Sequence, residues 1–338
     1  MKKLISLICV LAMVLALAAC GSSAPAAATE APAASTEAPA EDVSADKTFV
    51  VGICQLVQHP ALDAATQGFK DALTEALGDK VTFQEQNASG DSATCSLICN
   101  QFVSDEVDLI MANATASIQA AASATNTIPI LGTSITDYGV ALGVDNWTGV
   151  SGTNISGTSD LAPLDGQAAM IQELFPEAKT IGLLYCSGEP NSIFQADSME
   201  ALLTDMGYSV ECYTFADSND VSSVTANACS NSDVLYIPTD NTAASCTEAI
   251  NNVALSAGIP IVAGEEGIAS GCGVATLSIS YYDLGRATGE MAAEILTEGA
   301  DVSTMEVRFA PAFTKEYNAD ICEALNITVP EAYVAIAK

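Results

Sequence analysis

Polar residues suited to bind a small solute follow several apolar segments of this sequence directly. They stand where a strand would end and a helix would begin, at Gly132-Thr133-Ser134, at Asp240-Asn241 and at Glu265-Glu266. In an open parallel sheet, ligands lie beyond the carboxyl ends of the strands, where helix N-termini carry a partial positive charge. Hydroxyl, amide and carboxylate groups at such positions therefore favour reversible binding of a polar ligand.

A solute with the two charges of an amino acid needs partners of two kinds. Its carboxylate is bound best by backbone N–H groups and hydroxyls at a helix N-terminus. The candidates in the first half are Ala114, Thr115, Thr133 and Ser134. Its ammonium group needs a carboxylate, and the candidates are Asp160, Asp240 and Glu265. A charge-assisted hydrogen bond contributes about 1.5–3 kcal/mol, so losing one should weaken binding about tenfold or more.

Several of these residues have a structural role as an alternative. Thr115 and Ser134 can cap helices while still facing a cleft. Asn241 or Thr242 can cap the helix expected over about 243–256, which would leave Asp240 free for a ligand.

Further candidates lie in other strand-end loops. Gln55 and His59 follow the first strand, and Asn191 follows a strand of the second half. A loop or capping role is the alternative for His59 and Asn191. Asn241 completes the ligand-binding candidates. An aromatic ligand would need an apolar or aromatic wall, and the available rings are Tyr138, Trp147, Phe194, Tyr281 and Tyr282.

Alternating strand and helix patterns place these residues in an α/β fold. Apolar β-rich segments are expected at 48–53, 81–86, 109–112, 128–131, 180–185, 209–215, 234–237, 259–262, 274–277 and 305–309. Helical periodicity between them indicates parallel sheets covered by helices on both faces. We expect one lobe from 48–160 plus about 281–304, and a second from about 161–280 plus 305–338, with the first crossing near Asp160.

Composition excludes several classes of function. The chain has 338 residues, enough for two lobes, with 10 Lys and Arg against 42 Asp and Glu. That balance argues against a nucleic-acid partner, which needs a basic surface. A single His excludes a multi-histidine metal site. We expect no cofactor and no metal.

The N-terminus predicts export and lipid attachment. Lys2 and Lys3 precede an apolar run over 4–19 that ends in Leu17-Ala18-Ala19-Cys20. This resembles a bacterial lipoprotein signal over 1–20, with Cys20 lipidated; an ordinary signal peptide or a lone membrane helix is the alternative. Residues 21–46 are rich in Ala, Pro, Ser, Thr and Glu and predict a disordered tether. The folded part would then be anchored at the extracytoplasmic face of the membrane.

The cysteines predict neither a disulfide framework nor a zinc site. Of 11 cysteines, Cys9 and Cys20 would be lost to the signal and the lipid, which leaves nine and at least one unpaired. Several lie in or beside apolar segments, as buried small hydrophobic residues do. Cys95 and Cys99 share a helical face, but zinc needs more ligands than this pair supplies.

Five motifs occur in an order that a known family shares. They are Val51-Gly52-Ile53 through His59-Pro60-Ala61-Leu62-Asp63, Asn87-Ala88-Ser89-Gly90-Asp91, Ser187-Gly188-Glu189-Pro190-Asn191-Ser192, Pro238-Thr239-Asp240-Asn241-Thr242 and Tyr281-Tyr282-Asp283-Leu284-Gly285. From about residue 48 to about 310, the sequence resembles the ABC-transporter substrate-binding lipoproteins of the tryptophan/tyrosine type. The resemblance implies a type I periplasmic-binding-protein fold, with two Rossmann-like lobes joined by a three-segment hinge and a ligand in the cleft. It also implies a separate permease and ATPase. The segment 264–272 departs from the family, since it is rich in Gly and Cys where relatives tend to carry basic residues.

The sequence therefore predicts a monomeric binding protein for a small amino acid-like solute, most simply an aromatic one. A nucleoside or sugar ligand, or a ligand-sensing receptor subunit of the same fold, stays open because this fold serves many ligands. An enzyme, with Cys54 as nucleophile and His59 as base, is the alternative from a different functional class. No GxSxG, HExxH, Walker or GxGxxG motif supports it.

Overall fold

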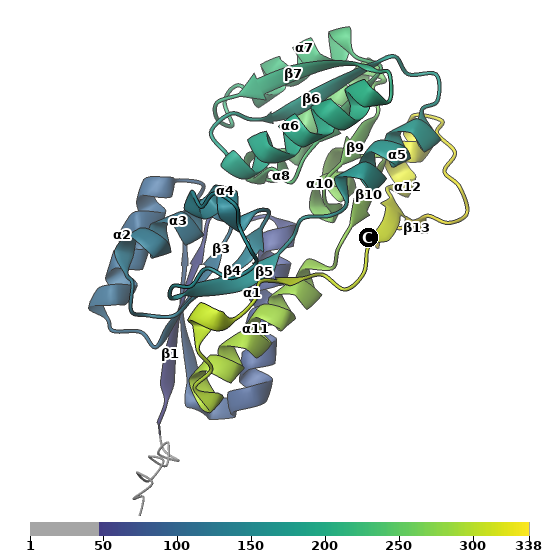
Figure 1. The fold of residues 1–338 in the computed structure, drawn as a ribbon. Helices are drawn as coiled ribbons and strands as arrows, with labels where there is room; N and C mark the ends of the chain where they lie inside the picture. The colour runs from purple at the N-terminus through teal and green to yellow at the C-terminus, as the bar shows by residue number, and fades with distance from the viewer. Residues whose placement is uncertain (1–46, 338) are drawn as a thin grey trace, which may run out of the picture. The chain divides into compact units, whose positions relative to one another are not determined.

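The structure is a computed structural model that describes residues 47–337 (Figure 1). The expected signal over 1–20, its Cys20 and the expected tether over 21–46 lie outside the described residues. Within 47–337, no helix combines the length and apolar character needed to cross a bilayer.

The first lobe is built on a six-stranded sheet in the order β11-β5-β4-β3-β1-β2, in which every pairing is parallel. Its strands are β1 (Phe49–Gln55), β2 (Val81–Asn87), β3 (Leu109–Asn113), β4 (Ile130–Ile135), β5 (Ile155–Ser159) and β11 (Arg308–Phe309). Its helices are α1 (Pro60–Leu77), α2 (Ser92–Ser104), α3 (Thr115–Ala124), α4 (Tyr138–Leu142) and α11 (Tyr281–Glu298), with short 3₁₀ turns η1 (Gly78–Lys80) and η2 (Val302–Thr304).

The second lobe is built on a seven-stranded sheet in the order β13-β12-β10-β9-β8-β6-β7. Its strands are β6 (Thr180–Cys186), β7 (Ser209–Phe215), β8 (Val234–Ile237), β9 (Ile261–Ala263), β10 (Ala275–Ser278), β12 (Thr314–Tyr317) and β13 (Val334–Ala335). Its helices are α5 (Leu164–Leu174), α6 (Pro190–Asp205), α7 (Val221–Asn231), α8 (Asn241–Ser245), α9 (Thr247–Ala257), α10 (Glu266–Cys272) and α12 (Ala319–Ala324). Only β12 runs antiparallel to its neighbour, β10. Two sheets of mostly parallel strands confirm the predicted α/β fold class.

Side-chain alternation along β1 shows how the first sheet is buried on both faces. Val51 and Ile53 pack in one apolar cluster with Phe69 of α1 and Met291 of α11. Cys54, which points the other way, belongs to a second cluster formed with α2 and α3. A strand buried on both faces reads as a continuous apolar run, which is the pattern of its sequence.

Helix α1 begins and ends where its sequence directs. Pro60 occupies the first turn, where its missing N–H costs nothing, and Gly78 ends the helix at φ 57°. The helix packs directly against α11, whose Gly285 allows the close approach (Figure 1). A Cβ atom at Gly285 would overlap the carbonyl oxygen of Ala65. Helix α1 therefore carries His59 at its start on a firmly packed support.

The structure corrects the predicted course of the chain in two places. Residues 155–159, where no strand was expected, form β5 between β11 and β4 of the first sheet. Residues 305–338 were assigned to the second lobe, but β11 pairs with β5 through Arg308 to Thr158 and Phe309 to Ser159. That assignment is therefore wrong for β11. Strand β11 has only two residues and a weak strand pattern, so the sequence does not indicate which sheet it joins.

Smaller elements also escaped prediction. The helix expected over 243–256 is two helices, α8 and α9, separated at Cys246. Helices α4 and α10 and strands β12 and β13 were not expected. Each is seven residues or shorter, too short for a period to show in the sequence.

Candidate ligand-binding site

The strand ends of the two lobes meet around a small cavity of about 10 Å³. It is lined by His59, Leu62, Ser134, Thr136, Asp160, Asn191, Thr239, Asp240, Asn241, Ala244, Glu265 and Tyr281. Seven of the candidates predicted from sequence are among them: His59, Ser134, Asp160, Asn191, Asp240, Asn241 and Glu265. A room of this size holds about one water molecule. It therefore fits one small polar group of a ligand.

Asp160 lies directly after β5, where the chain first leaves the first lobe. Its Oδ2 accepts a hydrogen bond of 3.0 Å from the hydroxyl of Tyr281, the first residue of α11. Its Oδ1 is buried and has no partner. Burial raises the pKa of Asp160 to about 6, although the hydrogen bond from Tyr281 opposes the shift. Asp160 thus offers the cavity one free carboxylate oxygen.

His59 and Asn241 join the two lobes across the cavity. The His59 Nε2 lies 3.3 Å from Oδ1 of Asn241. The other end of that amide, Nδ2, donates to Oε2 of Glu189 at 2.7 Å, which fixes which end faces the histidine. Nε2 therefore carries the proton, and the buried Nδ1 is left without a partner. Burial lowers the pKa of His59, which favours the neutral ring.

Ser134 is held in an unusual conformation at the end of β4. Its φ is 56°, in the left-handed region, and its buried hydroxyl has no hydrogen-bond partner. The predicted capping role for Ser134 is wrong, because β4 runs on to Ile135 and the next helix is capped by Asp137. Backbone strain and an unpartnered hydroxyl together are typical of a functional position.

Asp240, not Asn241 or Thr242, is the N-cap of α8, so the predicted capping order is wrong. Its Oδ1 accepts from the Ala243 N–H at 2.7 Å, and its Oδ2 accepts from the Cys186 N–H at 2.6 Å. Burial, reinforced by the charge of Glu189, raises the pKa of Asp240. Both of its oxygens are therefore engaged, although the side chain still lines the cavity.

Glu265 has a similar role one strand further on. It is the N-cap of α10, with its carboxylate accepting from the N–H groups of Gly267 and Ile268. Burial raises the pKa of Glu265 to about 7. Glu265 lines this cavity, whereas its neighbour Glu266 does not.

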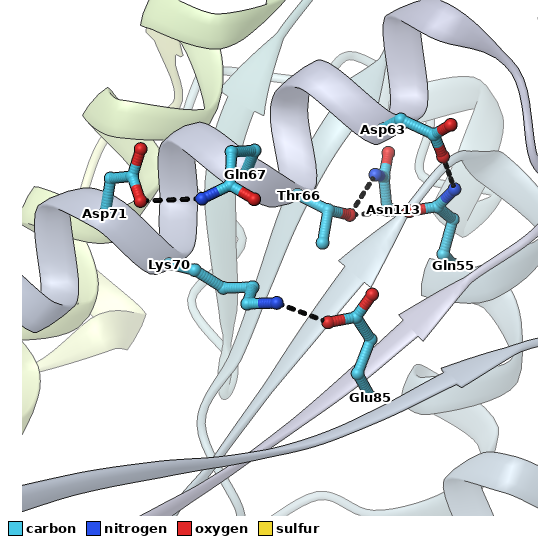
Figure 2. Close-up of polar contacts among 8 residues, drawn as sticks. All are labelled: Gln55, Asp63, Thr66, Gln67, Lys70, Asp71, Glu85 and Asn113. Carbon is cyan, nitrogen blue, oxygen red and sulfur yellow. Dashed lines mark hydrogen bonds and ion pairs between the residues drawn. The ribbon is translucent and has the colours of Figure 1, made fainter.

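Four predicted residues do not line the small cavity: Gln55, Ala114, Thr115 and Thr133. The side chain of Gln55 holds the start of α1, since Nε2 donates to Asp63 Oδ1 at 2.6 Å and Oε1 accepts from Thr66 at 2.7 Å (Figure 2). Thr133 is buried in the sheet, where its hydroxyl accepts from Thr158.

The start of α3 differs from the predicted cap. Thr115 is the first helical residue rather than the N-cap, which is Ala114 at φ 88°. Ala114 has no side chain able to cap, so the first N–H groups of α3 have no side-chain partner. Ala116, one residue further, lines a larger cavity beside the small one.

Asn191 is also not a cap, because Glu189 is the N-cap of α6. Its Nδ2 donates to the carbonyl oxygen of Thr239 at 3.0 Å. Glu189 itself was missed from sequence, yet its carboxylate accepts from the N–H groups of both Asn241 and Thr242. The sequence shows that Glu189 directly precedes α6. It does not show that the side chain of Glu189 reaches α8.

Two larger cavities adjoin the small one. The first, of about 280 Å³, shares Asn241 with it and is partly lined by Leu56 and Val57. The second, of about 320 Å³, shares Glu265 and Tyr281. Of the aromatic residues considered from sequence, Tyr281 alone lines the small cavity within the described chain.

The three cavities contain no lysine or arginine among the described residues. The basic side chains of residues 47–337 are Lys47, Lys70, Lys80, Lys179, Arg286, Arg308 and Lys315, and none of them lines the three cavities. Five are paired with carboxylates elsewhere. The electrostatic character of the cleft is thus set by acidic groups and one neutral imidazole.

The described residues offer no other obvious chemistry. Within 47–337, no group of three or more His, Cys, Asp or Glu side chains is placed to hold a metal ion. The nine cysteines of this range are all free thiols, and seven of them are buried. A contact with Cys99, together with burial, raises the pKa of Cys54 to about 12 although a contact with Cys95 lowers it, and a thiol of so high a pKa is a poor nucleophile.

Comparison with known proteins agrees with this geometry. Two α/β lobes, each built on a sheet of mostly parallel strands, with a polar cavity between their strand ends define a type I periplasmic binding protein. The sequence model described as ABC transporter substrate binding protein matches residues 50–338, and the chain belongs to that family. It is therefore a substrate-binding protein of the ABC-transporter type.

Similar proteins have recorded ligands. The chain is 38% identical over 280 residues to a tyrosine-binding protein of Clostridioides difficile, covering 82% of this chain and 81% of that one. It is similar to a Streptococcus pneumonia ABC domain solved in complex with L-Trp, at a TM-score of 0.82 and 31% identity, covering 86% of this chain and all of that one. It is also similar to a ligand-free, open substrate-binding protein with adhesive properties from Clostridium difficile, at a TM-score of 0.66 and 38% identity, covering 86% and 100%.

Proposed function

We propose that this protein captures an aromatic amino acid, tyrosine or tryptophan, in the cleft between its lobes and delivers it to an ABC permease. The single observation that carries the proposal is the free, buried Oδ1 of Asp160 in a cavity the size of one small polar group. The ligands recorded for the relatives from Clostridioides difficile and Streptococcus pneumonia support the aromatic class.

The amino group of the ligand would occupy the small cavity. An unpartnered carboxylate oxygen in a buried site is costly unless a donor satisfies it, and an ammonium ion supplies charge as well as donors. The carboxylate of the ligand would lie in the adjoining cavity near Ala116, where the uncapped N-terminus of α3 offers N–H groups. Leu56 and Val57 of the same cavity would contact the aromatic ring.

Capture requires the lobes to separate and close again. The small cavity, of about 10 Å³, cannot admit a whole amino acid while His59 of one lobe contacts Asn241 of the other. The chain crosses between lobes after Asp160, before Tyr281 and after β11, and such short connections permit hinge closure. The Asp160–Tyr281 hydrogen bond ties two of these crossings together, so a ligand at Asp160 would act directly on the hinge.

We further propose the cellular setting from the sequence. The lipoprotein signal ending at Cys20 would anchor the protein at the extracytoplasmic face of the membrane, and 21–46 would tether it. A permease and an ATPase would complete the importer, with this subunit acting as a monomer and without catalysis. Co-purification with a permease, as against a receptor kinase, separates transport from sensing.

Calorimetry and thermal melting test the ligand class. Tyrosine or tryptophan should raise the melting temperature of residues 47–338 more than the other amino acids, nucleosides and sugars do. Asp160→Asn should weaken binding at least tenfold, because it replaces a charged acceptor by a neutral one. Asp79→Asn, at an exposed carboxylate in the same lobe, is the matched control. Equal affinity in Asp160→Asn and the unaltered protein would remove the proposed anchor.

A further inference from the structure

We infer that the amine is the one charged group of the ligand that this cleft demands, so the protein also binds aromatic monoamines that lack a carboxylate, such as tyramine. The inference rests on the proposed function and extends its ligand class. Four features of the cleft carry it: the unpartnered atoms, the histidine tautomer, the size of the small cavity and the distribution of charge.

Three residues that line the small cavity each carry a buried polar atom without a hydrogen-bond partner: Asp160 Oδ1, His59 Nδ1 and Ser134 Oγ. Their residues are each at most 7% exposed. Buried polar atoms are almost always paired, so three around one cavity mark a place that a ligand completes. Only three other such side-chain atoms occur in the part of the chain that the structure describes, and none of their residues lines this cavity.

All three atoms can accept a hydrogen bond. The carboxylate oxygen of Asp160 is an acceptor only, and a serine hydroxyl accepts as readily as it donates. His59 Nδ1 accepts because Nε2 holds the ring proton, which it donates to Asn241. The Asn241 amide cannot reverse this, since Glu189 accepts from its Nδ2. Three acceptors match the three N–H bonds of a primary ammonium ion.

The size of the cavity selects the same group. About 10 Å³ holds a single water-sized group, and –NH₃⁺ has that size whereas a carboxylate is larger. The rest of the ligand must then lie in an adjoining cavity of about 280 or 320 Å³. Any carboxylate on the ligand would lie there too, outside the polar pocket.

The cleft as a whole disfavours a second negative charge. Its three cavities are lined by six acidic residues, Asp160, Glu189, Asp217, Asp240, Glu265 and Glu266, and by no lysine or arginine among the described residues. Two helix N-termini that could receive a ligand carboxylate are already occupied by the chain. Asp240 and Glu189 accept from the first N–H groups of α8, and Glu265 accepts from those of α10. The starts of α1, α3 and α6 border the cavities without a side-chain cap, but no basic side chain of the described residues strengthens any of them. Removing the ligand carboxylate therefore costs little affinity and relieves its repulsion by the acidic groups.

Three ligands of one skeleton test this by isothermal titration calorimetry at pH 7.5: tyrosine, tyramine and 3-(4-hydroxyphenyl)propanoate. We expect tyramine to bind within tenfold of tyrosine or more tightly, and the propanoate, which lacks the amine, to bind at least a hundredfold more weakly. Tight tyrosine binding without tyramine binding would overturn this inference and leave the proposed function standing. Failure of all three would count against both.

Two variants show whether the amine occupies the small cavity. Asp160→Asn should weaken tyrosine and tyramine by a similar factor of at least ten, since both lose the same contact. His59→Gln keeps a polar side chain but removes the Nδ1 acceptor, and should weaken both by several fold even if Asp160→Asn does not fold. Asp79→Asn serves as the control, with melting curves to verify folding. A loss confined to tyrosine in either folded variant would contradict the assignment of the amine.

Discussion

At the scale of single residues, Asp160 is the one carboxyl group lining the small cavity, among the described residues, that has a buried oxygen without a hydrogen-bond partner. Asp160 was a candidate because the ammonium group of a ligand needs a carboxylate, and it does line the cavity. Asp240 and Glu265 were candidates for the same reason, yet backbone N–H groups engage both. Residue type and strand-end position are local properties that a sequence shows. Which oxygen remains free depends on amides contributed by other strands, so it could not be predicted.

The titration of Asp160 predicts how binding depends on pH. Burial raises its pKa to about 6, so it is ionised above that value and protonated below. An ammonium ligand needs the ionised form, and the dissociation constant should therefore rise about tenfold from pH 7 to pH 5. Glu265, Asp240 and Tyr281 also face this group, and protonation of His59 would add repulsion in the same direction.

Calorimetry of tyrosine from pH 8 to pH 5 checks this, with Asp160→Asn expected to give a flatter profile. The profile of the unaltered protein would have to be level over the whole range for the expectation to be wrong.

At the scale of elements, one carboxylate organises the start of α8. Glu189, before α6, accepts from both the backbone and side chain of Asn241 and of Thr242, at 2.7–3.0 Å. It thereby aligns two helices and fixes the amide that faces His59. Short helices of this kind are not stable by propensity and depend on such tertiary contacts.

Replacing Glu189 by Gln should both destabilise the second lobe and weaken binding. The N–H groups of Asn241 and Thr242 now donate to carboxylate oxygens of Glu189. In the variant, the NH₂ group of Gln would replace one of those oxygens and leave donors unpaired, which lowers the free energy of unfolding by about 1–3 kcal/mol. Asn241 would then lose its orientation toward His59. Thermal melting and calorimetry should show a lower melting temperature and a higher dissociation constant, with Asp197→Asn on the exposed side of α6 as the control. Unchanged affinity in a folded Glu189→Gln protein would show that the amide orientation does not matter.

The contact between α1 and α11 gives a second test at this scale. Gly285→Ala would place a methyl group against the Ala65 carbonyl, and overpacking of this kind costs about 1–3 kcal/mol. The same change should move Tyr281, at the start of α11, and so disturb its hydrogen bond to Asp160. We expect a lower melting temperature, while Glu290→Ala on the exposed face of α11 should leave it nearly unchanged. An undiminished melting temperature in Gly285→Ala would mean that the helices can move apart freely.

At the scale of the whole molecule, long periodic segments made the fold predictable. The strands at 49–55, 180–186 and 209–215 and helices such as α1 and α11 carry apolar residues at a clear period, and they fixed the two-lobe α/β interpretation. Strand β5, with the sequence Ile-Ser-Gly-Thr-Ser, has almost no apolar character, although its residues are all buried. Its place in the sheet depends on pairing with β4 and β11. Of these, β11 is distant in the sequence and has a weak strand pattern.

Buried acids together with a formal net charge of −32 predict the pH dependence of stability without ligand. Asp160 and Glu265 have pKa values raised to about 6 and about 7, and that of Asp240 is raised too, so the folded state retains protons that the unfolded chain releases. Stability should fall as pH rises from 5 to 7.5, and repulsion among surface acids acts in the same direction. The lowered pKa of His59 acts in the opposite direction, because the folded state favours the neutral ring, but it involves a single group.

Scanning calorimetry across that range should show a melting temperature several degrees lower at pH 7.5 than at pH 5, with Glu265→Gln reducing the difference. A melting temperature that increases with pH would contradict the assignment of these groups as buried acids.

The return of α11 and β11 to the first lobe has a consequence for how the protein matures. Met291 belongs to the same apolar cluster as Val51, so a chain emerging from the ribosome cannot complete that core until α11 has been made. Until then, one side of the earliest sheet stays uncovered. Such a late-closing architecture keeps the nascent polypeptide loose for most of its synthesis, the condition in which a chain can be threaded through a narrow channel.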